Sequence, residues 1–596
     1  MGKRAVWIVG FALLALAPAL ITNPYGRDVM ILALVFGFVT LGLNLVFGYA
    51  GQPAFGHPVF FGIGAYASTL LSVDGHWPVA LSIAAGALIA GVLSVVVAYP
   101  CYRLRGIYFG MATIAYGYVI YVIVENWVDL TRGPMGIPSV PPLSLLPPWL
   151  VFGLDNEVQF HLLLVALLVL TVGIIGRVVS SPIGRAWIAL RENEALAASV
   201  GIHALRYKMT AFAYGAGLAG LGGGFYAHYI GFLGPDTLSF HTIGIVLIML
   251  IGGGMGTLAG PVVGAIAFGV LPEVLRAAEQ ARDLLLGAVL LLCIAFLPEG
   301  LVGLWARLDR LSWWRRLGVA ETARRAPAPS VTGEPRPPRA GARLEVTSLT
   351  KRFDGLTAVS GVTFVADPGE IVGLIGPNGA GKTTLFNMIA GTLAPSDGVL
   401  RYGDKIVSGL PPATIARLGI ARSFQITSLF PALSAAENLR TATHLWSRPS
   451  LIGAVLRTRD FRAREAAIEA TVVEILRIVG LADRAKNPAR ALSYGDQRRL
   501  EVGITLATGG KLLLLDEPCA GLNPTETEEF RALLLRLRGE GYGIVLIEHD
   551  THLVMGVCDR VVVLSHGEKI AEGLPRDVVV DPAVIEAYLG TAGSHA

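Results

Sequence analysis

Charged residues are scarce in the first half of the chain. Residues 1–300 hold 13 Lys/Arg and 13 Asp/Glu, whereas 66 of the chain's 92 charged side chains lie in the remaining 296 residues. Hydrophobic residues make up 53% of all 596, and the mean hydropathy is +0.60. Such a chain is too long and too apolar for one ordinary soluble domain, which excludes a purely cytosolic enzyme and a disordered protein.

Cysteine is also rare, with Cys101, Cys293, Cys519 and Cys558 as the only four. Their spacing matches no metal site, and so few thiols exclude a secreted disulfide scaffold. We interpret all four as reduced, structural thiols. The net charge is only +4, so nothing in the overall charge suggests a nucleic-acid partner.

Apolar segments long enough to cross a bilayer, which takes about 20 residues, fill the first half. Ten candidate spans are expected near 5–22, 28–50, 56–73, 78–99, 106–128, 158–178, 208–230, 240–257, 258–275 and 283–299. The third, eighth and ninth are short or rich in glycine. Eight or nine spans, some of them half-helices, therefore remain an alternative.

Basic residues in the short loops set the orientation of such spans. With ten spans, the basic residues at 3–4, 103–105 and 177–208 and those after residue 300 all fall on one side, the cytoplasm. The count of ten thus agrees with the charge rule. The first segment, with Ala-Leu-Ala at 15–17, also resembles a signal peptide, whose cleavage is the less favoured alternative.

Glycine and isolated polar residues lie within the apolar segments. Small residues let helices approach closely in lipid, so glycines such as Gly215, Gly220 and Gly252–Gly254 predict tight packing rather than direct solute contacts. Interfacial placement or a satisfied helix contact is expected for each polar residue near a span. These residues are Asn44, Gln52, His57, Glu125, His161, His228 and His241.

Two segments outside the spans stand out. Residues 180–207 mix charges with apolar positions after Pro182, which predicts a short amphipathic cytoplasmic helix, either solvated or docking on a partner. Residues 301–343 hold nine arginines, three acids, and five prolines within 327–338. That composition predicts an extended tether, with Trp305, Trp313 and Trp314 anchoring its start at the lipid surface.

The pattern becomes α/β from Leu344 onward. A buried strand is expected at 370–375, and residues 376–384 then read Gly-Pro-Asn-Gly-Ala-Gly-Lys-Thr-Thr before an apolar helix. This matches G-x-x-x-x-G-K-S/T in its required strand–loop–helix setting. Backbone N–H groups of such a loop wrap a phosphate at a helix N-terminus. Lys382 would reach the β- and γ-phosphates and Thr383 would bind Mg²⁺, so ATP and Mg²⁺ are the predicted cofactors.

Four leucines at 512–515 predict a buried parallel strand that ends at Asp516. Asp516 is placed to hold Mg²⁺ directly or through water, and Glu517 to polarise the attacking water. An acidic pair at a strand end can also cap a helix. The phosphate loop upstream favours catalysis.

Further segments resemble the ATP-binding cassette (ABC) ATPases. Residues 492–497 (Leu-Ser-Tyr-Gly-Asp-Gln) resemble the signature sequence, 423–425 (Ser-Phe-Gln) the Q-loop, 520–523 the D-loop and 547–550 the switch-histidine segment. Phe353 lies where this family has an adenine-stacking aromatic residue. The order and spacing of these segments across about 344–590 make the resemblance specific.

This resemblance implies a role for each matching residue. The catalytic residues would be Glu517, His549 and Gln425, of which Gln425 senses the γ-phosphate and metal and His549 contacts the γ-phosphate. Mg²⁺ would be bound by Thr383, Gln425 and Asp516. ATP would be bound by Phe353, Val359, Gly376, Asn378, Gly379, Ala380, Gly381, Lys382, Thr383 and Thr384.

ABC ATPases close as head-to-tail dimers around two ATP molecules, so the resemblance also implies that one copy cannot build a complete site. The signature residues would act on the ATP bound by the facing subunit, and the D-loop would lie beside them. These residues are Ser493, Tyr494, Gly495, Gln497 and, in the D-loop, Asn523.

Three positions depart from the general ABC pattern. Tyr494 replaces a glycine, Asp496 is inserted before Gln497, and Asn523 replaces an aspartate. All three resemble the ATPases of branched-chain amino-acid importers, as does the ending at 584–590. Residues 44–52, 55–57, 61–66, 185–201 and 252–261 resemble the matching permeases.

The chain therefore resembles a fusion of two normally separate subunits. A polytopic α-helical membrane permease domain (1–300, about ten spans) is joined by the Arg/Pro-rich linker (301–343) to an α/β P-loop ABC ATPase domain (344–596). By analogy, the short helix at 186–194 would be a coupling helix that docks on the ATPase near Gln425. Its residues would be Arg185, Ile188, Arg191, Glu192 and Glu194.

The resemblance implies one half of an ABC importer in the bacterial inner membrane, with its ATPase domain in the cytoplasm. A separate solute-binding protein would deliver Leu, Ile or Val, and a second permease–ATPase pair, identical or homologous, would complete the transporter. Import of urea or short amides remains an alternative within the same family. An exporter, against which the short cytoplasmic loops argue, and an ATPase-gated membrane sensor are the others.

Overall fold

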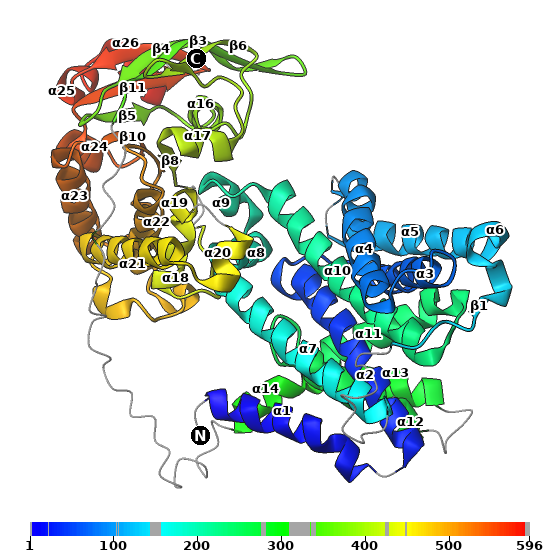
Figure 1. Ribbon diagram of the computed structural model, residues 1–596. Coiled ribbons are helices and arrows are strands. Elements are labelled where there is room, and N and C mark those ends of the chain that lie inside the picture. The colour runs from blue at the N-terminus through cyan, green and yellow to red at the C-terminus, as the bar shows by residue number, and fades with distance from the viewer. Residues whose placement is uncertain are drawn as a thin grey trace, which may run out of the picture. The chain divides into compact units, whose positions relative to one another are not determined.

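The computed structural model describes residues 3–21, 23–102, 104, 106–143, 156–275, 282–297, 299–308, 334, 341–423, 428–447 and 450–589. They fall into two compact units. The first lies within Met1–Arg191 and Leu205–Pro327, and the second within Glu192–Ala204 and Ala328–Ala596. Helices dominate the first unit, and the second combines two sheets with helices, as predicted (Figure 1).

Each of the ten predicted spans contains a helix of the first unit. These helices are α1 (Lys3–Leu20), α2 (Pro24–Leu43), α3 (Val59–Val73), α4 (Val79–Cys101), α5 (Ile107–Asn126), α7 (Asn156–Val179), α10 (Ala204–Ile230), α11 (Phe240–Gly253), α12 (Gly260–Val274) and α13 (Arg282–Phe296). A π-helix, η1 (Asn44–Tyr49), continues α2. Short elements, among them α6 (Val128–Thr131) and the strand pair β1 (Ile137–Pro138) and β2 (Phe232–Leu233), connect them.

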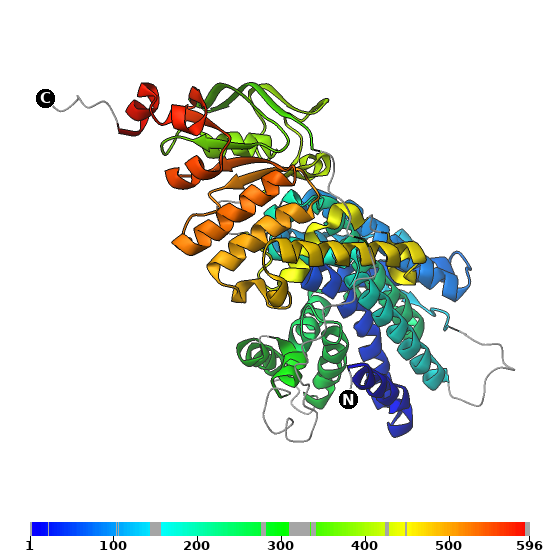
Figure 2. The same cartoon turned by 90° about the vertical axis from the view of Figure 1, so that its left-hand side faces the viewer.

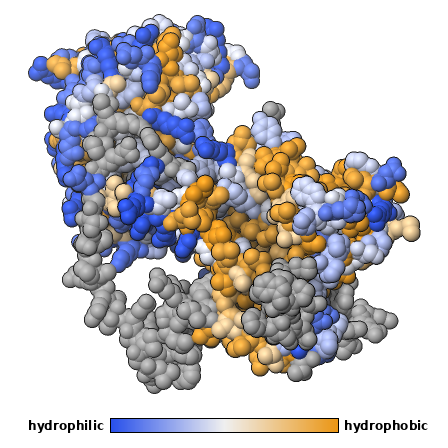
Figure 3. Space-filling view, viewed as in Figure 1, coloured by the Kyte–Doolittle hydropathy of each residue, from blue (hydrophilic) through white to orange (hydrophobic). Residues whose placement is uncertain are grey.

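Four helices are long and apolar enough to cross a membrane over the described residues: Pro24–Tyr49, Val79–Cys101, Ile107–Asn126 and Glu157–Val179. The other six fall short in length or in apolar character there, so the count of ten spans is not confirmed. Apolar side chains nevertheless cover much of the visible surface of this unit, whereas the visible surface of the second unit is mostly hydrophilic (Figure 3). On α4, the exposed Leu88, Val92 and Val96 follow one helix face, as contact with lipid requires.

The glycines of α10 allow neighbouring helices to approach its backbone. A Cβ atom at Gly64 of α3 would stand 2.2 Å from the Cα of Gly220, and one at Gly42 of α2 would stand 2.3 Å from the carbonyl oxygen of Gly215. Any side chain at these positions would push the helices apart. This confirms the prediction that the glycines serve close packing.

Three of the polar residues near the spans have satisfied contacts, as predicted, whereas the prediction is wrong for His57, which is buried without a hydrogen-bond partner among the described residues. The Asn44 amide donates to the Thr257 carbonyl and accepts from the Gly256 N–H, both at 2.8 Å. The Nε2 atom of His161 lies 2.8 Å from the Leu14 carbonyl oxygen. The ring of His228 lies 2.9 Å from the Ser68 hydroxyl through Nε2 and 2.7 Å from the Pro141 carbonyl oxygen through Nδ1.

The start of the predicted linker is part of the first unit. Residues Gly300–Leu308 form α14, which packs on α11 and α12. Apart from residues 334 and 341–343, the rest of 301–343 lies outside the described residues, as do Trp313, Trp314 and the side chain of Trp305. The tether and its aromatic anchor therefore stay predictions. All four cysteines are free thiols, as predicted.

The larger sheet of the second unit has the strand order β12-β11-β5-β10-β9-β8. Its strands are β5 (Ile371–Ile375), β8 (Ile420–Arg422), β9 (Leu512–Asp516), β10 (Gly543–Ile547), β11 (Arg560–Ser565) and β12 (Glu568–Gly573). All neighbours pair in parallel except β11 and β12. The strands β5, β9 and β10 are fully buried, which explains their continuous apolar sequences. Their carboxyl ends therefore lie along one edge of the sheet.

The smaller sheet is antiparallel, with the order β4-β3-β6-β7. Its strands are β3 (Leu344–Phe353), β4 (Leu356–Ala366), β6 (Asp397–Tyr402) and β7 (Lys405–Ile406). One apolar core lies between the sheets and includes Phe364 of β4, Leu374 of β5 and Phe386 of α16 (Lys382–Ile389). The two sheets thus enclose the helix that follows the predicted phosphate loop.

Other helices of the second unit flank the sheets. They are α17 (Pro412–Leu418), α18 (Ala435–Ala442), α19 (His444–Ser447), α20 (Leu451–Leu456), α21 (Arg459–Ile478), α22 (Tyr494–Ala507), α23 (Pro524–Gly539), α24 (Thr551–Val557), α25 (Pro575–Val578) and α26 (Pro582–Leu589). Helices α18, α21 and α22 pack on one another (Figure 2).

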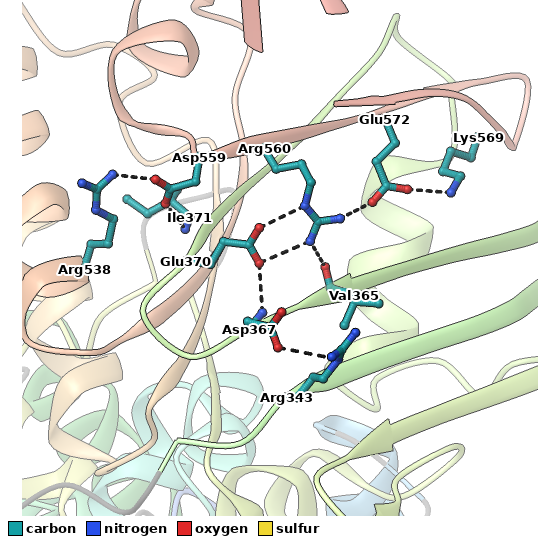
Figure 4. Close-up of polar contacts among 10 residues, drawn as sticks. All are labelled: Arg343, Val365, Asp367, Glu370, Ile371, Arg538, Asp559, Arg560, Lys569 and Glu572. Atoms are coloured by element: carbon teal, nitrogen blue, oxygen red, sulfur yellow. Dashed lines mark hydrogen bonds and ion pairs between the residues drawn. The ribbon is translucent and has the colours of Figure 1, made fainter. Parts of the chain in front are cut away.

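An ionic network joins the two sheets (Figure 4). The guanidinium of Arg560, in β11, donates to both carboxylate oxygens of Glu370 at 3.0 and 3.2 Å and to the carbonyl of Val365 in β4 at 2.7 Å. It also pairs with Glu572 of β12. The hydrogen bonds that Arg560 donates to Glu370 raise the pKa of Arg560. One side chain thus connects β4 of the smaller sheet to β11 and β12 of the larger one.

Replacing Arg560 with methionine is expected to lower the free energy of unfolding of this unit by about 2–3 kcal/mol, because Glu370 and Glu572 lose their shared cation. Thermal unfolding of the full chain, followed by circular dichroism, measures the change. The matched control is Arg576→Met, since Arg576 is largely exposed and, among the described residues, pairs only with its neighbour Asp577, at 3.6 Å. Equal stability of the two variants would contradict the role given to Arg560.

Candidate functional site: an ATP-binding edge of the larger sheet

The phosphate loop (376–384) joins β5 to α16. Gly376, Gly379 and Gly381 have φ angles of +148°, +83° and +93°, which side chains rarely adopt. A Cβ atom at Gly381 would also stand 2.4 Å from the carbonyl oxygen of Ala358. The loop conformation therefore requires glycine, and such a loop at a helix N-terminus is an arrangement that binds phosphate.

The side chain of Lys382 lies within this loop. It is only 7% exposed, and its ammonium donates to the carbonyl oxygens of Gly376 at 2.6 Å and of Pro377 at 3.0 Å. Burial lowers the pKa of Lys382, while the nearby carboxylates of Glu517 and Asp516 raise it. The loop thus fixes one cation beside two acidic groups. Thr383, the next residue, is exposed.

Asp516 ends β9 and is completely buried. Neither of its carboxylate oxygens has a hydrogen-bond partner among the described residues, although Nη2 of Arg422 lies 3.6 Å from Oδ2. Burial raises the pKa of Asp516, and the charge of Arg422 opposes that shift. Apart from the Arg422 guanidinium near Oδ2, no described residue forms an ion pair or hydrogen bond with this buried carboxylate, so its oxygens fit a divalent metal ion.

The structure brings Glu517 and His549 together. Glu517 follows β9 and His549 follows β10, and these strands pair in parallel so that Asp516 is opposite Ile547. As a result, Oε1 of Glu517 lies 3.1 Å from Nε2 of His549. Glu517 also has a φ angle of +48°, a strained value for a residue with a side chain. Strain of this kind is typical of functional sites, where the backbone aims a reactive group.

The described edge of the sheet therefore fits ATP with Mg²⁺. The glycine loop with Lys382 offers backbone and cationic donors to phosphate, and Thr383 and Asp516 offer oxygen ligands of the kind Mg²⁺ prefers. Gln425, the third predicted metal ligand, lies outside the described residues together with the rest of 424–427.

The signature segment begins a helix. Ser493 is the N-cap of α22, and its hydroxyl accepts a hydrogen bond from the N–H of Asp496 at 3.2 Å. The inserted Asp496 is buried in the first turn and forms ion pairs with Arg484 and, at 2.6 Å, with Arg499. A negative charge is favourable at a helix N-terminus, so this departure from the general pattern is stabilised locally.

The other two departures are also explained. The Tyr494 hydroxyl donates to the Ala520 carbonyl at 3.1 Å and accepts from the Arg498 guanidinium, which links the signature helix to the D-loop. Asn523 is the N-cap of α23 and forms a capping box with Glu526.

The other two predicted signature residues are also held locally. The side-chain amide of Gln497 donates to the Leu492 carbonyl, and a Cβ atom at Gly495 would clash with Glu526.

Two residues predicted to bind ATP, Phe353 and Val359, differ in solvent exposure. Phe353, at the end of β3, is exposed, with the ammonium of Lys351 5.1 Å from its ring centroid. Val359 is fully buried in the core, and its side chain would lie 3.2 Å from a Cβ atom at Gly381. Phe353 is thus free to stack on a base, whereas Val359 supports the phosphate loop from within and does not face a ligand.

Three residues near the site were not predicted. Arg422 lies beside Asp516, and its only sequence signal is its place just before the Q-loop. Glu548 is buried and accepts hydrogen bonds from the N–H groups of Cys519 at 2.8 Å and His549 at 3.2 Å; burial raises its pKa. Burial raises the pKa of Tyr588, on α26, and the backbone of Gly376 in the phosphate loop opposes that shift.

The segment predicted as one coupling helix at 186–194 is two helices, which corrects that expectation. Helix α8 (Pro182–Glu192) ends before Asn193, whose side chain caps α9 (Glu194–Ser199) by accepting from the Leu196 N–H at 3.0 Å. An N-cap has non-helical φ and ψ angles, so Asn193 interrupts the helix. Helix α8 begins at Pro182 and buries one apolar face that includes Ile183, Trp187 and Leu190, which confirms the predicted short amphipathic helix.

The two helices also belong to different units. In the first unit, the indole of Trp187 on α8 donates to the Tyr207 carbonyl, and Arg191 donates to the Gly48 carbonyl at 2.7 Å. Arg185 and Ile188 lie on the same helix. The second unit includes Glu192–Ala204. Within it, α9, which begins at Glu194, packs on α17. The Glu192 carboxylate there accepts from the Ala432 N–H at 3.3 Å.

A phosphate loop, an acidic strand end and a capped signature helix on this pair of sheets define the nucleotide-binding cassette of an ABC transporter. Family comparisons match residues 27–294 to the "Branched-chain amino acid transport system / permease component", 359–520 to "ABC transporter" and 568–594 to "Branched-chain amino acid ATP-binding cassette transporter". The chain belongs to the branched-chain amino-acid ABC transporter family and carries its permease and its ATPase in one polypeptide.

Individual relatives match the ATPase part. The high-affinity branched-chain amino acid transport ATP-binding protein BraF of Pseudomonas aeruginosa is 42% identical over 250 residues, which are 42% of this chain and 98% of BraF. LivG of Escherichia coli K12 is 44% identical with the same coverage. A crystal structure of the ADP conformation of an ABC transporter cassette is 29% identical, has a TM-score of 0.37, and covers 42% of this chain and 100% of that cassette.

Proposed function

We propose that this chain is one half of an ABC importer that moves leucine, isoleucine and valine across the bacterial inner membrane at the expense of ATP. The observation that carries the proposal is the joint presence of the permease match at 27–294 and the branched-chain cassette match at 568–594 in one polypeptide. The permease half supplies the path for the solute. The cassette half, in the cytoplasm, supplies the energy.

The site geometry supports a division of labour within the cassette. Lys382 and the loop bind the β- and γ-phosphates, and Phe353 stacks on the adenine. Thr383, Asp516 and, from the family pattern, Gln425 would hold Mg²⁺. Glu517 orients and deprotonates the attacking water, while His549, 3.1 Å from Glu517, contacts the γ-phosphate. Mg²⁺ held there would neutralise negative charge on the phosphates. Gln425 couples the presence of the γ-phosphate and the metal ion to the conformation of the permease half.

The proposal requires partners. Ser493, Tyr494, Gly495 and Gln497 complete the ATP site of a facing cassette, with Asn523 beside them, so a second permease–ATPase pair is needed. A separate solute-binding protein delivers the solute. We also propose that α9 and its flanking residues transmit cassette closure, since Glu192–Ala204 already belongs to the cassette unit.

Uptake by cells that lack their own branched-chain amino-acid transporters tests the substrate. Cells expressing this chain, together with any partner permease and ATPase subunits and a solute-binding protein, are expected to take up labelled leucine, and excess isoleucine or valine should compete. Urea and acetamide should not compete. Competition by urea alone would overturn the proposed substrate, and uptake without any binding protein would argue against an importer of this type.

A further inference from the structure

Buried polar atoms without a partner gather in one part of the first unit. Among its described residues, the buried side-chain atoms that lack a hydrogen bond belong to Gln52, His57, Tyr66, Thr69 and Tyr116. Four of these five residues lie between positions 52 and 69, and the fifth is on α5. Buried polar groups are normally hydrogen-bonded, so such a concentration requires an explanation.

His57 is the most extreme member of the group. It lies in the turn before α3, is completely buried, and neither ring nitrogen has a partner among the described residues. The other two buried histidines described in this unit differ. His161 is bonded to the Leu14 carbonyl, and both ring nitrogens of His228 are bonded. The fold can satisfy a buried imidazole but does not satisfy this one.

The surroundings of His57 are apolar and aromatic. Its ring centroid lies 5.7 Å from that of Phe60 and 6.2 Å from that of Phe212, and Phe212 in turn contacts Phe109 at 5.7 Å. The ring of Tyr116 lies 6.4 Å from that of Phe60. Two unpartnered polar groups thus share one aromatic cluster formed by residues of α3, α5 and α10 and the turn before α3.

The turn that carries His57 is held in place. The N–H of Gly56 donates to the Thr113 hydroxyl of α5 at 3.1 Å, and a Cβ atom at Gly56 would stand 1.8 Å from the Thr113 carbonyl oxygen. On the other side, a Cβ atom at Gly215 of α10 would lie 2.9 Å from Nε2 of His57. The imidazole therefore lies where α10 meets the turn. Because residue 215 is glycine, no side chain at that position of α10 fills the space beside the ring.

We propose that His57 and Tyr116 bind the polar head group of the transported solute when α10 separates from α3 and α5, and that Phe60, Phe109 and Phe212 enclose its apolar part. A neutral imidazole offers one donor and one acceptor, and a tyrosine hydroxyl offers both. That set matches an amino acid, which has an ammonium donor and a carboxylate acceptor, while the rings suit a branched aliphatic side chain. This inference rests on the proposed function, which supplies the solute class.

The physical reason for the proposal is the cost of leaving these groups unpaired. A polar atom buried without a partner destabilises the fold, and replacement by an apolar group of similar shape is neutral or stabilising. Groups retained at such a cost are typical of functional sites. A transporter that alternates between conformations can pair them with solute in one conformation and bury them in another.

The test compares His57→Phe with His228→Phe in the full chain, assembled with its partner subunits. His57→Phe is expected to leave the unfolding temperature unchanged or raise it, and to raise the KM for leucine uptake about 10- to 100-fold, the effect of losing hydrogen bonds to charged groups. His228→Phe is expected to do the opposite, since it loses two bonds that hold α10: a lower unfolding temperature with a KM within about twofold of wild type.

Tyr116→Phe, which removes only the hydroxyl, supplies the second variant and should raise the KM about 3- to 10-fold without a loss of stability. A normal leucine KM in the stable His57→Phe variant would overturn the proposal. So would a fall in unfolding temperature as large as that of His228→Phe, because it would show that His57 has a structural partner. If the wild-type chain takes up urea and not leucine, the proposed substrate fails, and the same variants are compared with labelled urea.

Discussion

Replacing Glu517 with glutamine is expected to lower the rate of ATP hydrolysis by about 10²- to 10⁴-fold while ATP still binds. The Glu517 carboxylate lies 3.1 Å from His549 at the carboxyl edge of the sheet, where the attacking water would be polarised. Glutamine keeps the size of the side chain but cannot take a proton. The contacts expected to bind ATP come from the phosphate loop and remain. Phosphate release by the purified full-chain transporter, with binding of a fluorescent ATP analogue, measures both quantities.

The matched control for this variant is Glu528→Gln. Glu528 is 69% exposed on α23, and its one ion pair within the described part of the chain is with Arg531 of the same helix. Its replacement should therefore change hydrolysis by less than about twofold. Hydrolysis at the normal rate by Glu517→Gln would show that another group activates the water. Loss of ATP binding would show instead that Glu517 holds the loop together.

The same variant reports the composition of the transporter. Since Glu517→Gln binds ATP without hydrolysing it, paired cassettes should remain closed around the nucleotide. Native mass spectrometry of the tagged chain, purified with ATP and Mg²⁺ from its own host membranes, then shows either two copies of this chain or one copy with separate subunits. Two copies would mean that Ser493 of each chain serves the Lys382 loop of the other.

Much of the cassette could be predicted because its chemistry depends on local sequence. The glycine pattern of the phosphate loop needs backbone angles that only glycine adopts readily, and the leucines before Asp516 need burial on both sides. The resemblance named both Glu517 and His549 as catalytic residues, and parallel pairing of β9 and β10 brings them together. Local rules and a family pattern were therefore sufficient here.

Other features depend on packing that no local pattern shows. The break at Asn193 could not be predicted from the sequence, because asparagine is also tolerated within helices. It is evident only from the hydrogen bond that the Asn193 side chain accepts from the Leu196 N–H. Val359 was predicted to bind ATP from its place in the family pattern, but its side chain is fully buried in the core. In the membrane unit, His57 and His228 both lie near the ends of apolar segments, and only their partners distinguish them.

Replacing Lys382 with alanine is expected to weaken ATP binding about 10- to 100-fold, because a buried ammonium that would contact the phosphates is lost. The carbonyl groups of Gly376 and Pro377 also lose their donor, so the loop is less well held. Lys382→Arg should not restore binding, since the larger planar guanidinium does not fit a site that is only 7% exposed. Titration with ATP measures the affinity, and leucine uptake should be lost in both variants.

Lys405→Ala is the matched control for this prediction, because Lys405 is exposed on β7 and its removal should leave ATP affinity unchanged. Wild-type affinity in Lys382→Ala would contradict the role given to the loop. Membrane insertion should survive in every variant, since the permease unit has its own core. Lys382→Ala and Glu517→Gln then separate the two steps. If uptake stops in both but only Glu517→Gln retains bound ATP, transport requires hydrolysis as well as binding.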